Sequence, residues 1–119
     1  MTRRSVVHVE IPAANREESA KFYSQLFGWD FQHFGEPMNY TTFQAGNLGG
    51  GYFDTTQGAK VGDVRVYIES EDIDADLKNI EKAGGKTATP KTEIPGYGWF
   101  ATFTDPSGNT MALYTGQRG

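Results

Sequence analysis

An internal repeat is the feature of this 119-residue chain that most constrains its fold. The stretch VVHVEI at residues 6–11 recurs 57 positions later as DVRVYI at residues 63–68. In both stretches apolar residues alternate with a period of two, which is typical of a half-buried strand. A module of about 57 residues would have only a marginal core alone, so the two copies are expected to form one domain.

A helix is predicted after each repeated strand. Asn15 and Asp72 are favoured N-cap residues, and Glu18 follows Asn15 by three positions, as in a capping box. Gly28 is expected to end the first helix and Gly84 and Gly85 the second, since glycine commonly ends a helix. The residues expected to face the sheet are Phe22, Tyr23, Leu26 and Phe27 in the first helix and Ile73, Leu77 and Ile80 in the second.

Three further strands are predicted after each helix. They correspond to WDFQHF, MNYTTFQA and LGGGYFDT in the first half, and to KTATP, GWFATFTD and NTMALYT in the second. The DPSGN segment before the last strand is a predicted turn, because it combines proline and glycine. We therefore predict an α+β fold of two tandem βαβββ modules, about residues 5–54 and 63–115. Their curved sheets are expected to surround a central cup within one domain, residues 1–119.

Composition excludes several classes of function. The chain has 15 acidic and 11 basic residues, and its formal charge of −4 is unlike the basic surface that nucleic acids require. No apolar stretch approaches the roughly 20 residues that span a bilayer, and no signal peptide is recognisable. The absence of cysteine excludes disulfides and thiolate chemistry. We expect a soluble, cytoplasmic protein whose partner is a small molecule, not nucleic acid or a membrane.

The second side of each repeated strand is polar. His8 and Glu10 alternate with the apolar residues of the first strand, and Arg65 and Tyr67 hold the equivalent positions in the second. Side chains alternate across a strand and the helices must cover the apolar faces, so the polar faces look away from the helices. We predict that these four side chains meet across the central cup. In an alternative interpretation, a Glu10–Arg65 ion pair closes a polar seam between the halves.

The aromatic residues favour a ligand pocket over a simple seam. Pockets for small molecules combine aromatic walls with a few polar groups. The predicted ligand-binding residues are Tyr52, Phe53, Trp99 and Tyr114, together with Arg65 and Tyr67. Each aromatic residue taken singly also fits ordinary core packing or a dimer contact.

Two other features are less informative about function. The segment NLGGGYF lacks the spacing of a phosphate-binding loop, so we interpret it as a strand in which a close backbone approach matters. Either a ligand that lies on the sheet or the close packing of a curved strand would require this approach to the backbone. His33, in FQHF, is interpreted as a surface or packing residue.

The repeated modules, the stretch HVEIPAANREESAKFYSQLFGW and the ending DPSGNTMALY resemble the vicinal oxygen chelate superfamily. That superfamily includes glyoxalase I, extradiol dioxygenases and bleomycin-resistance proteins. The resemblance covers nearly the whole chain and is closest to small bacterial glyoxalase-like proteins. It implies the glyoxalase-like fold, but one fold hosts many activities, so the substrate stays open.

The resemblance also implies where a metal would be bound. It places the ligand positions of the superfamily's metalloenzymes at His8, Gly51, Arg65 and Ala112. Only His8 can coordinate, since glycine and alanine have no side-chain donor and arginine is permanently cationic. Glu10 could add a second ligand, but two are fewer than the usual three or four. We therefore expect no metal and no other cofactor.

Three functional hypotheses follow. In the first, this glyoxalase- or bleomycin-resistance-like protein holds a small organic molecule in a metal-free aromatic cup, with Arg65 available for a carboxylate or phosphate. In the second, it is an enzyme of the same superfamily, either of the dioxygenase type or a metal-free lyase or isomerase in which His8 or Glu10 is the general acid or base. In the third, it is a non-catalytic dimeric interaction module. A homodimer is expected because similar proteins commonly pair and edge strands need cover.

Overall fold

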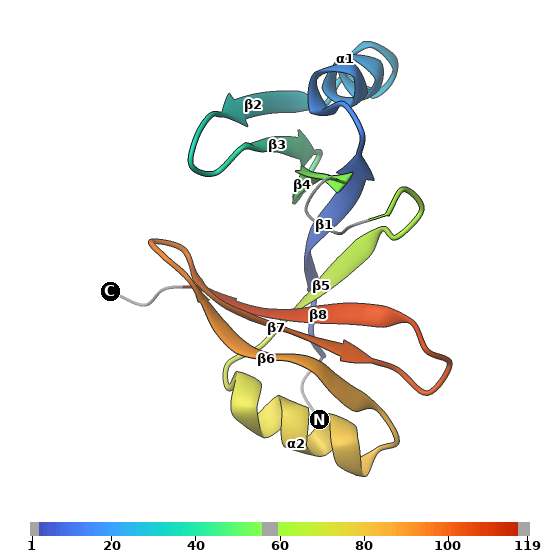
Figure 1. The fold of residues 1–119 in the computed structure, drawn as a ribbon, viewed down its shortest axis with the longest axis vertical. Helices are drawn as coiled ribbons and strands as arrows, with labels where there is room; N and C mark the ends of the chain where they lie inside the picture. The colour runs from blue at the N-terminus through green and yellow to red at the C-terminus, as the bar shows by residue number, and fades with distance from the viewer. Residues whose placement is uncertain (1–2, 56–59, 117–119) are drawn as a thin grey trace. The chain divides into compact units, whose positions relative to one another are not determined.

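The structure, a computed structural model, describes residues 3–55 and 60–116. It contains two compact units, which are drawn in Figure 1. The N-terminal unit comprises His8–Arg65, and the C-terminal unit comprises Val66–Gly119 together with Met1–Val7. The elements follow the order strand, helix and three strands twice along the chain. The predicted α+β fold of two tandem βαβββ modules is therefore confirmed.

The N-terminal unit is built on a sheet with the strand order β2-β3-β4-β1. Its strands are β1 (Val6–Ala13), β2 (Asp30–Phe34), β3 (Tyr40–Ala45) and β4 (Leu48–Asp54), and its helix is α1 (Arg16–Phe27). β1 runs parallel to β4, whereas β3 is antiparallel to both β2 and β4. The core between α1 and the sheet is formed by Ala13, Ala20, Phe43 and Tyr52.

Helix α1 begins and ends at the residues that the sequence predicted. The Asn15 side-chain oxygen accepts a hydrogen bond from the Glu18 amide at 3.0 Å, which satisfies one of the free amides of the first turn. Gly28 follows the last helical residue in the left-handed conformation, with φ of 71°. Glycine adopts this conformation without the steric strain that a side chain would add.

The predicted inward face of α1 is wrong for three residues. Phe22, Leu26 and Phe27 are 53%, 61% and 60% exposed. The helix instead buries Ala20, and Tyr23 packs against the core. Successive helical residues are about 100° apart, so a face centred on positions 20 and 23 turns positions 22 and 26 away from the sheet.

Trp29 explains why this rotation is favourable. Its ring stacks on Tyr23 and on Phe43, with centroid distances of 5.0 and 4.8 Å. The Ser24 hydroxyl also donates a hydrogen bond to the Trp29 carbonyl at 2.6 Å. A stacked aromatic layer therefore fills the space beside the small Ala20, and aromatic rings supply much of the buried area in such a core.

The C-terminal unit has the strand order β5-β8-β7-β6. Its elements are β5 (Arg65–Glu69), α2 (Ile73–Lys82), β6 (Lys86–Ile94), β7 (Gly98–Thr104) and β8 (Thr110–Gly116). β5 runs parallel to β8, and the other neighbours are antiparallel. Helix α2 lies along one side of β6, β7 and β8 (Figure 1). The predicted inward face of α2 is confirmed, since Ile73 and Leu77 are buried and Ile80 packs on the core.

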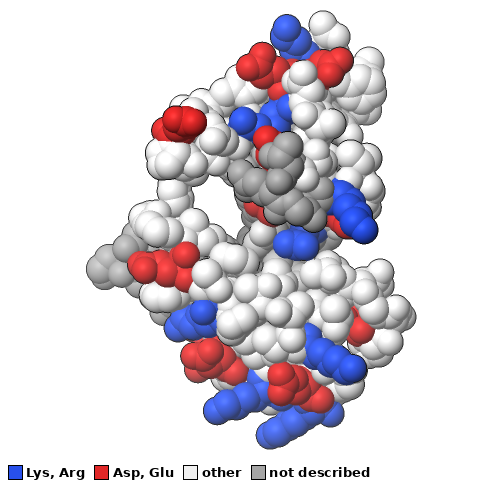
Figure 2. All heavy atoms as spheres, viewed as in Figure 1, with Lys and Arg blue, Asp and Glu red and all other residues white. Residues whose placement is uncertain are grey.

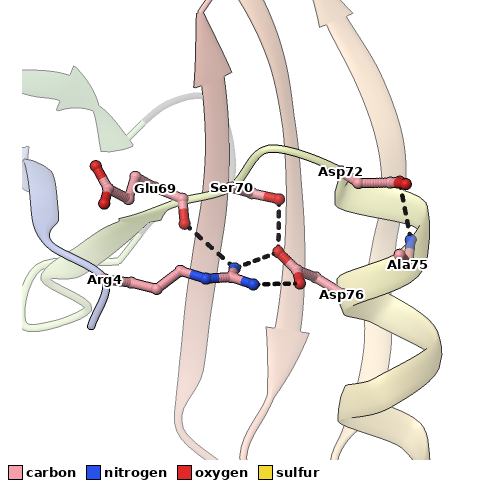
Figure 3. Close-up of polar contacts among 6 residues, drawn as sticks. All are labelled: Arg4, Glu69, Ser70, Asp72, Ala75 and Asp76. Atoms are coloured by element: carbon pink, nitrogen blue, oxygen red, sulfur yellow. Dashed lines mark hydrogen bonds and ion pairs between the residues drawn. The ribbon is translucent and has the colours of Figure 1, made fainter. Parts of the chain in front are cut away.

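Arg4 and Ser5, just before β1, are bonded to the C-terminal unit. The Ser5 carbonyl accepts a hydrogen bond from the Glu69 amide at 3.0 Å. The guanidinium of Arg4 binds both carboxylate oxygens of Asp76 in the first turn of α2, and the Ser70 hydroxyl donates to the same carboxylate (Figure 3). The hydrogen bond from Arg4 holds the pKa of Asp76 below its usual range, since it stabilises the ionised form.

The predicted DPSGN turn is also confirmed. One carboxylate oxygen of Asp105 accepts hydrogen bonds from the amides of Ser107 and Asn109, at 3.0 and 2.9 Å. The other oxygen accepts from the Asn109 side chain at 3.1 Å. These contacts lower the pKa of Asp105 and fix the approach of β7 to β8.

Charged side chains of both signs are intermixed over α2, as Figure 2 shows. The helix places two aspartates in its first turn and a lysine in its last, which suits the helix dipole. Neither helix in residues 3–55 and 60–116 is long and apolar enough to cross a membrane.

Candidate functional site

The sheet of the N-terminal unit has one face under α1 and one face turned away from it. In the strand register, Glu10 lies opposite Gly51, and Gly51 lies opposite Thr42. Paired residues point to the same side of a sheet, and side chains alternate along each strand. His8, Glu10 and Tyr40 therefore share the face away from α1. This confirms the prediction that the polar side of β1 looks away from the helix.

These three side chains form a hydrogen-bonded group, which we call the His8–Tyr40–Glu10 triad. The Tyr40 hydroxyl donates to Glu10 Oε2 at 2.8 Å and lies 3.0 Å from His8 Nε2. His8 Nε2 and Glu10 Oε2 are 3.6 Å apart, so the hydroxyl bridges them. The side chains of His8 and Glu10 are 29% and 17% exposed, which leaves both partly shielded from water.

The bridging hydroxyl determines where the protons lie. A carboxylate only accepts hydrogen bonds, so the single proton of Tyr40 is directed at Glu10. The Tyr40 oxygen must then accept its bond from His8, which assigns a proton to His8 Nε2. The triad is thus a directed chain from imidazole through phenol to carboxylate.

Tyr40 was not among the predicted site residues. The sequence contained a signal for it in the glycine run of β4, because a large aromatic residue on one strand often covers a glycine on the next. The structure places the Tyr40 ring over Gly51 and the Phe43 ring over Gly50. The glycine run therefore serves the close packing of strands, the second of the two interpretations.

Tyr52 and Phe53, both predicted to bind ligand, lie on opposite faces of this sheet. Tyr52 is 0% exposed in the core under α1, and this burial raises its pKa to about 12. Phe53 lies two positions after Gly51 and so shares the face of the triad. Only Phe53 of this pair therefore lies where it can line a site at the triad.

The predicted ligand-binding residues of the C-terminal unit are also divided between two faces. Tyr67 lies opposite Ala112, and Tyr114 follows two positions later, so Tyr67 and Tyr114 share the face away from α2. Tyr67 is buried, and the Tyr114 hydroxyl donates to the Tyr97 carbonyl at 2.7 Å. Arg65, the last residue of the N-terminal unit, begins β5, is partly buried, and leaves this strand on the same side as Tyr67.

Trp99 lies on the other face of that sheet. Trp99 is two positions before Ala101, which is buried under α2, so the two side chains leave β7 on the same side. The Lys91 ammonium lies 4.9 Å from the centroid of the Trp99 ring, a cation–π distance. The convergence of His8 and Glu10 with Arg65 and Tyr67 around one cup stays a prediction.

A polar pocket of about 420 Å³ opens on the α1 side of the N-terminal unit. It is lined by Ala14, Asn15, Arg16, Glu17, His33, Phe34, Gly35, Thr41 and Asp54. His33 Nδ1 lies 2.7 Å from the hydroxyl of the buried Thr41, so this histidine is held by a neighbouring strand. The lining carries charges of both signs and lies on the face opposite to the triad.

The family comparison agrees with this architecture. The profile described as "Glyoxalase/Bleomycin resistance protein/Dioxygenase superfamily" matches residues 5–113. The chain belongs to this superfamily. The resemblance found in the sequence motifs is therefore confirmed, and so is the glyoxalase-like character of the fold.

Two relatives are about one-third identical to this chain. A glyoxylase-like domain-containing protein of Didymella fabae is 35% identical over 118 residues, with 90% of each chain covered. The anthracycline biosynthesis protein DnrV of Streptomyces peucetius is 32% identical over 113 residues, which cover 81% of this chain and 41% of DnrV. The chain thus spans less than half the length of DnrV.

Solved structures share the fold at low identity. A glyoxalase/bleomycin resistance protein/dioxygenase superfamily member from Vibrio splendidus 12B01 has a TM-score of 0.66 at 11% identity, with 94% of this chain and 98% of that chain covered. Methylmalonyl-CoA epimerase from Mycobacterium tuberculosis has a TM-score of 0.72 at 11% identity, with 95% and 88% covered. At such identities the likeness concerns the fold alone.

The metal positions implied for the superfamily do not fit the residues of this chain. Within residues 3–55 and 60–116, no three histidine, aspartate or glutamate side chains are grouped so that they could hold a metal ion. At position 51 the space for a side chain is filled by the Tyr40 ring. The donors that remain, His8 and Glu10, are bridged by a hydroxyl instead.

Proposed function

We propose that this protein binds a small organic molecule on the polar face of the N-terminal unit and exchanges a proton with it through the His8–Tyr40–Glu10 triad. The observation that carries this proposal is the bridging hydroxyl, which holds an imidazole and a carboxylate in one hydrogen-bonded chain. A base oriented by a neighbouring group is the arrangement that general acid–base catalysis requires. The reaction class is that of a metal-independent isomerase or lyase.

The proposed chemistry is the removal of a proton from carbon next to a carbonyl group. The C–H bond breaks, its electron pair stays on the substrate as an enolate, and the proton passes to an end group of the triad. If the imidazole of His8 takes it, Glu10 balances the new positive charge through the Tyr40 hydroxyl. Return of the proton to another position or face of the substrate gives the isomer and restores the triad.

The partial burial of the triad supports this role. With 29% and 17% exposure, His8 and Glu10 are reachable from solvent, yet each is shielded enough to strengthen hydrogen bonds and charge interactions. Phe53, on the same face, adds apolar surface for a bound molecule.

A hydrogen–deuterium exchange assay tests the proposal. A panel of 2-oxo acids and related carbonyl compounds is incubated with the protein in D2O, and loss of the carbon-bound proton is followed by proton NMR. We expect His8→Gln and Glu10→Gln each to slow the exchange by roughly 10²- to 10⁴-fold. Thr42→Val is the matched control, because Thr42 lies opposite Gly51 on the same face but outside the triad. Exchange that persists in the His8→Gln/Glu10→Gln double variant would contradict the proposal.

We propose that Arg65 binds a carboxylate or phosphate of the ligand. A guanidinium binds such planar or multidentate anions through two hydrogen bonds, which a lysine cannot reproduce. Thermal unfolding with a panel of small acids is compared for wild type and Arg65→Ala. The rise in Tm that an anion causes should disappear in the variant. An unchanged rise in Tm would show that Arg65 does not bind the anion.

A second candidate is binding of a planar polycyclic molecule without turnover. The 32% identity with the anthracycline biosynthesis protein DnrV favours it. Anthracycline-type compounds are therefore included in the thermal panel, with Phe53→Ala as the variant expected to weaken binding, because the ring contributes apolar contact area. Stabilisation by such compounds with no proton exchange on any panel member would favour this candidate over the first.

A further inference from the structure

Tyr40 contacts its partners by crossing a strand. It lies on β3, whereas His8 and Glu10 lie on β1, and β4 runs between these two strands. Neighbouring strands are about 4.8 Å apart, so roughly 10 Å separates β3 from β1. A tyrosine side chain can bridge that gap only if it lies across the face of β4.

Gly51 is the residue of β4 that the Tyr40 ring covers. A Cβ atom on Gly51 would lie 1.9 Å from the Tyr40 hydroxyl oxygen and 2.2 Å from its Cζ. Both distances are far below van der Waals contact, so a side chain at position 51 and the end of the ring would occupy the same space. In the register Gly51 stands between Thr42 of β3 and Glu10 of β1, on the path that the ring follows.

We propose that Tyr40 occupies the space of the side chain that position 51 lacks, and that Gly51 is thereby the positioning residue of the triad. The superfamily resemblance assigns position 51 to a metal ligand. In this chain a hydroxyl from the neighbouring strand takes that space, so a ligand on β4 is replaced by a proton-carrying group from β3. The catalytic meaning of this exchange rests on the function proposed above, whereas the steric relation of Gly51 to Tyr40 does not.

The other glycines of β4 show that this role belongs to position 51. A Cβ on Gly49, on the same face, would meet only the Gln44 side chain, at an ordinary 3.6 Å. A Cβ on Gly50 would lie 2.2 Å from the Phe43 ring and 2.5 Å from the Val9 carbonyl, but on the opposite, core face. Gly50 therefore serves packing, Gly49 is replaceable, and Gly51 alone of the three admits a triad member.

The test combines a double-mutant cycle with a direct probe of His8. Gly51→Ala is introduced into wild type and into Tyr40→Ala, and Gly49→Ala is the matched control on the same strand and face. Thermal unfolding is measured for all variants. The imidazole nitrogen shifts of His8 are followed by NMR with ¹⁵N-labelled histidine, and His33→Gln identifies the signals.

We expect Gly51→Ala to lower the Tm of wild type by about 5 °C or more, because the methyl group and the ring overlap. In the Tyr40→Ala background the same substitution should have little effect, and Gly49→Ala should stay within about 3 °C of its parent. The His8 nitrogen shifts in Gly51→Ala should match those in Tyr40→Phe, which lacks only the hydroxyl.

Several outcomes would decide the matter. If Gly51→Ala does not fold but Gly51→Ala/Tyr40→Ala does, the steric relation is supported. The proposal would be overturned if Gly51→Ala destabilised wild type and Tyr40→Ala equally, or if neither Gly51→Ala nor Gly51→Ala/Tyr40→Ala folded. It would also be overturned if the His8 nitrogen shifts in Gly51→Ala were those of wild type. A coupled Gly51–Tyr40 pair without proton exchange on any carbonyl compound would leave this inference standing and reject the proposed reaction. Proton exchange without coupling between Gly51 and Tyr40 would support the proposed reaction and reject this inference.

Discussion

At the scale of single residues, the tyrosines of the N-terminal unit have different roles because they leave the sheet on different faces. Tyr40 lies on the polar face and bridges His8 and Glu10. Tyr52, on the neighbouring strand, lies on the core face and is completely buried. The same side-chain chemistry therefore supplies a hydrogen-bonded hydroxyl in one case and packed aromatic surface in the other.

Removing the Tyr40 hydroxyl should affect function more than stability. In Tyr40→Phe the ring still covers Gly51, but His8 and Glu10 lose their bridge. We expect a loss of about 1 to 2 kcal/mol in the free energy of unfolding, measured in urea, and loss of proton exchange in D2O. Tyr52→Phe is the control for exchange, because it removes a hydroxyl on the core face, outside the triad. Comparable exchange in Tyr40→Phe and wild type would exclude a role for the hydroxyl.

Burial of Tyr52 predicts a loss of stability at alkaline pH. Its pKa is raised from 10.0 to about 12 in the folded protein, so the unfolded chain releases this proton first as the pH rises. The stabilisation is complete below pH 10.0 and is lost between that value and about 12. Tyr52→Phe should remove a decline of roughly 2 to 3 kcal/mol from the pH profile of unfolding free energy. Parallel profiles for variant and wild type would contradict this.

At the scale of elements, the two helices meet their sheets differently. α2 buries the face that its periodicity predicts, whereas α1 leaves Phe22, Leu26 and Phe27 exposed and packs through Ala20 and Tyr23. Apolar periodicity marks which residues prefer burial, but the rotation of a helix is set by the side chains it meets. In α1 the stacked Trp29 ring decides that rotation.

Substitutions on α1 should reveal this rotation. Leu26→Gln changes a side chain that is 61% exposed, so the free energy of unfolding should change by less than about 0.5 kcal/mol. Tyr23→Ala removes a ring that stacks on Trp29 and should lower it by roughly 3 kcal/mol or more. Chemical denaturation gives both values. Equal losses for the two variants would mean that the helix presents its originally predicted face.

The contact between the N-terminal segment and α2 predicts acid sensitivity. The Arg4 hydrogen bond lowers the pKa of Asp76 below its ordinary 3.8, so the folded state holds the ionised form more strongly than the unfolded chain does. The resulting stabilisation is present above pH 3.8 and is lost as the pH falls through the lower, folded pKa. Arg4 is 43% exposed, so solvent screening keeps the effect near 1 kcal/mol.

Asp76→Asn should therefore reduce the free energy of unfolding near neutral pH and flatten its decline below pH 3.8. Asp74→Asn, in the same turn of α2, is the matched control, because Arg4 binds Asp76. Thermal unfolding from pH 7 to pH 2 provides the profile. A variant whose profile stays parallel to that of wild type would show that the contact adds nothing to folding.

At the scale of the whole molecule, the chain repeats one module and adapts its two copies differently. The N-terminal unit places a hydrogen-bonded triad on the face away from its helix, and the C-terminal unit places two tyrosines on the equivalent face. Membership of the superfamily accounts for the architecture. The homodimer and the shared cup stay predictions.

The misfit between the superfamily's metal positions and this chain predicts indifference to chelators. Dialysis against EDTA should leave the Tm and the rate of proton exchange unchanged, because the His8–Tyr40–Glu10 triad is complete without a metal ion. Added Zn²⁺ or Ni²⁺ should likewise give no saturable stabilisation. A Tm that falls with EDTA and recovers with one divalent ion would contradict the metal-free mechanism.

The sequence by itself determined the elements, because strands, helices and their ends depend on local patterns. The period-two stretches predicted β1 and β5, and Asn15 and Asp72 predicted the starts of α1 and α2. The face on which His8 and Glu10 lie also followed from alternation alone. Tertiary structure decided which residues meet across strands, since that depends on register and on the shapes of neighbouring side chains. Tyr40 joins the triad because a glycine 11 positions later leaves room for its ring, and such a relation exists only after the strands have paired.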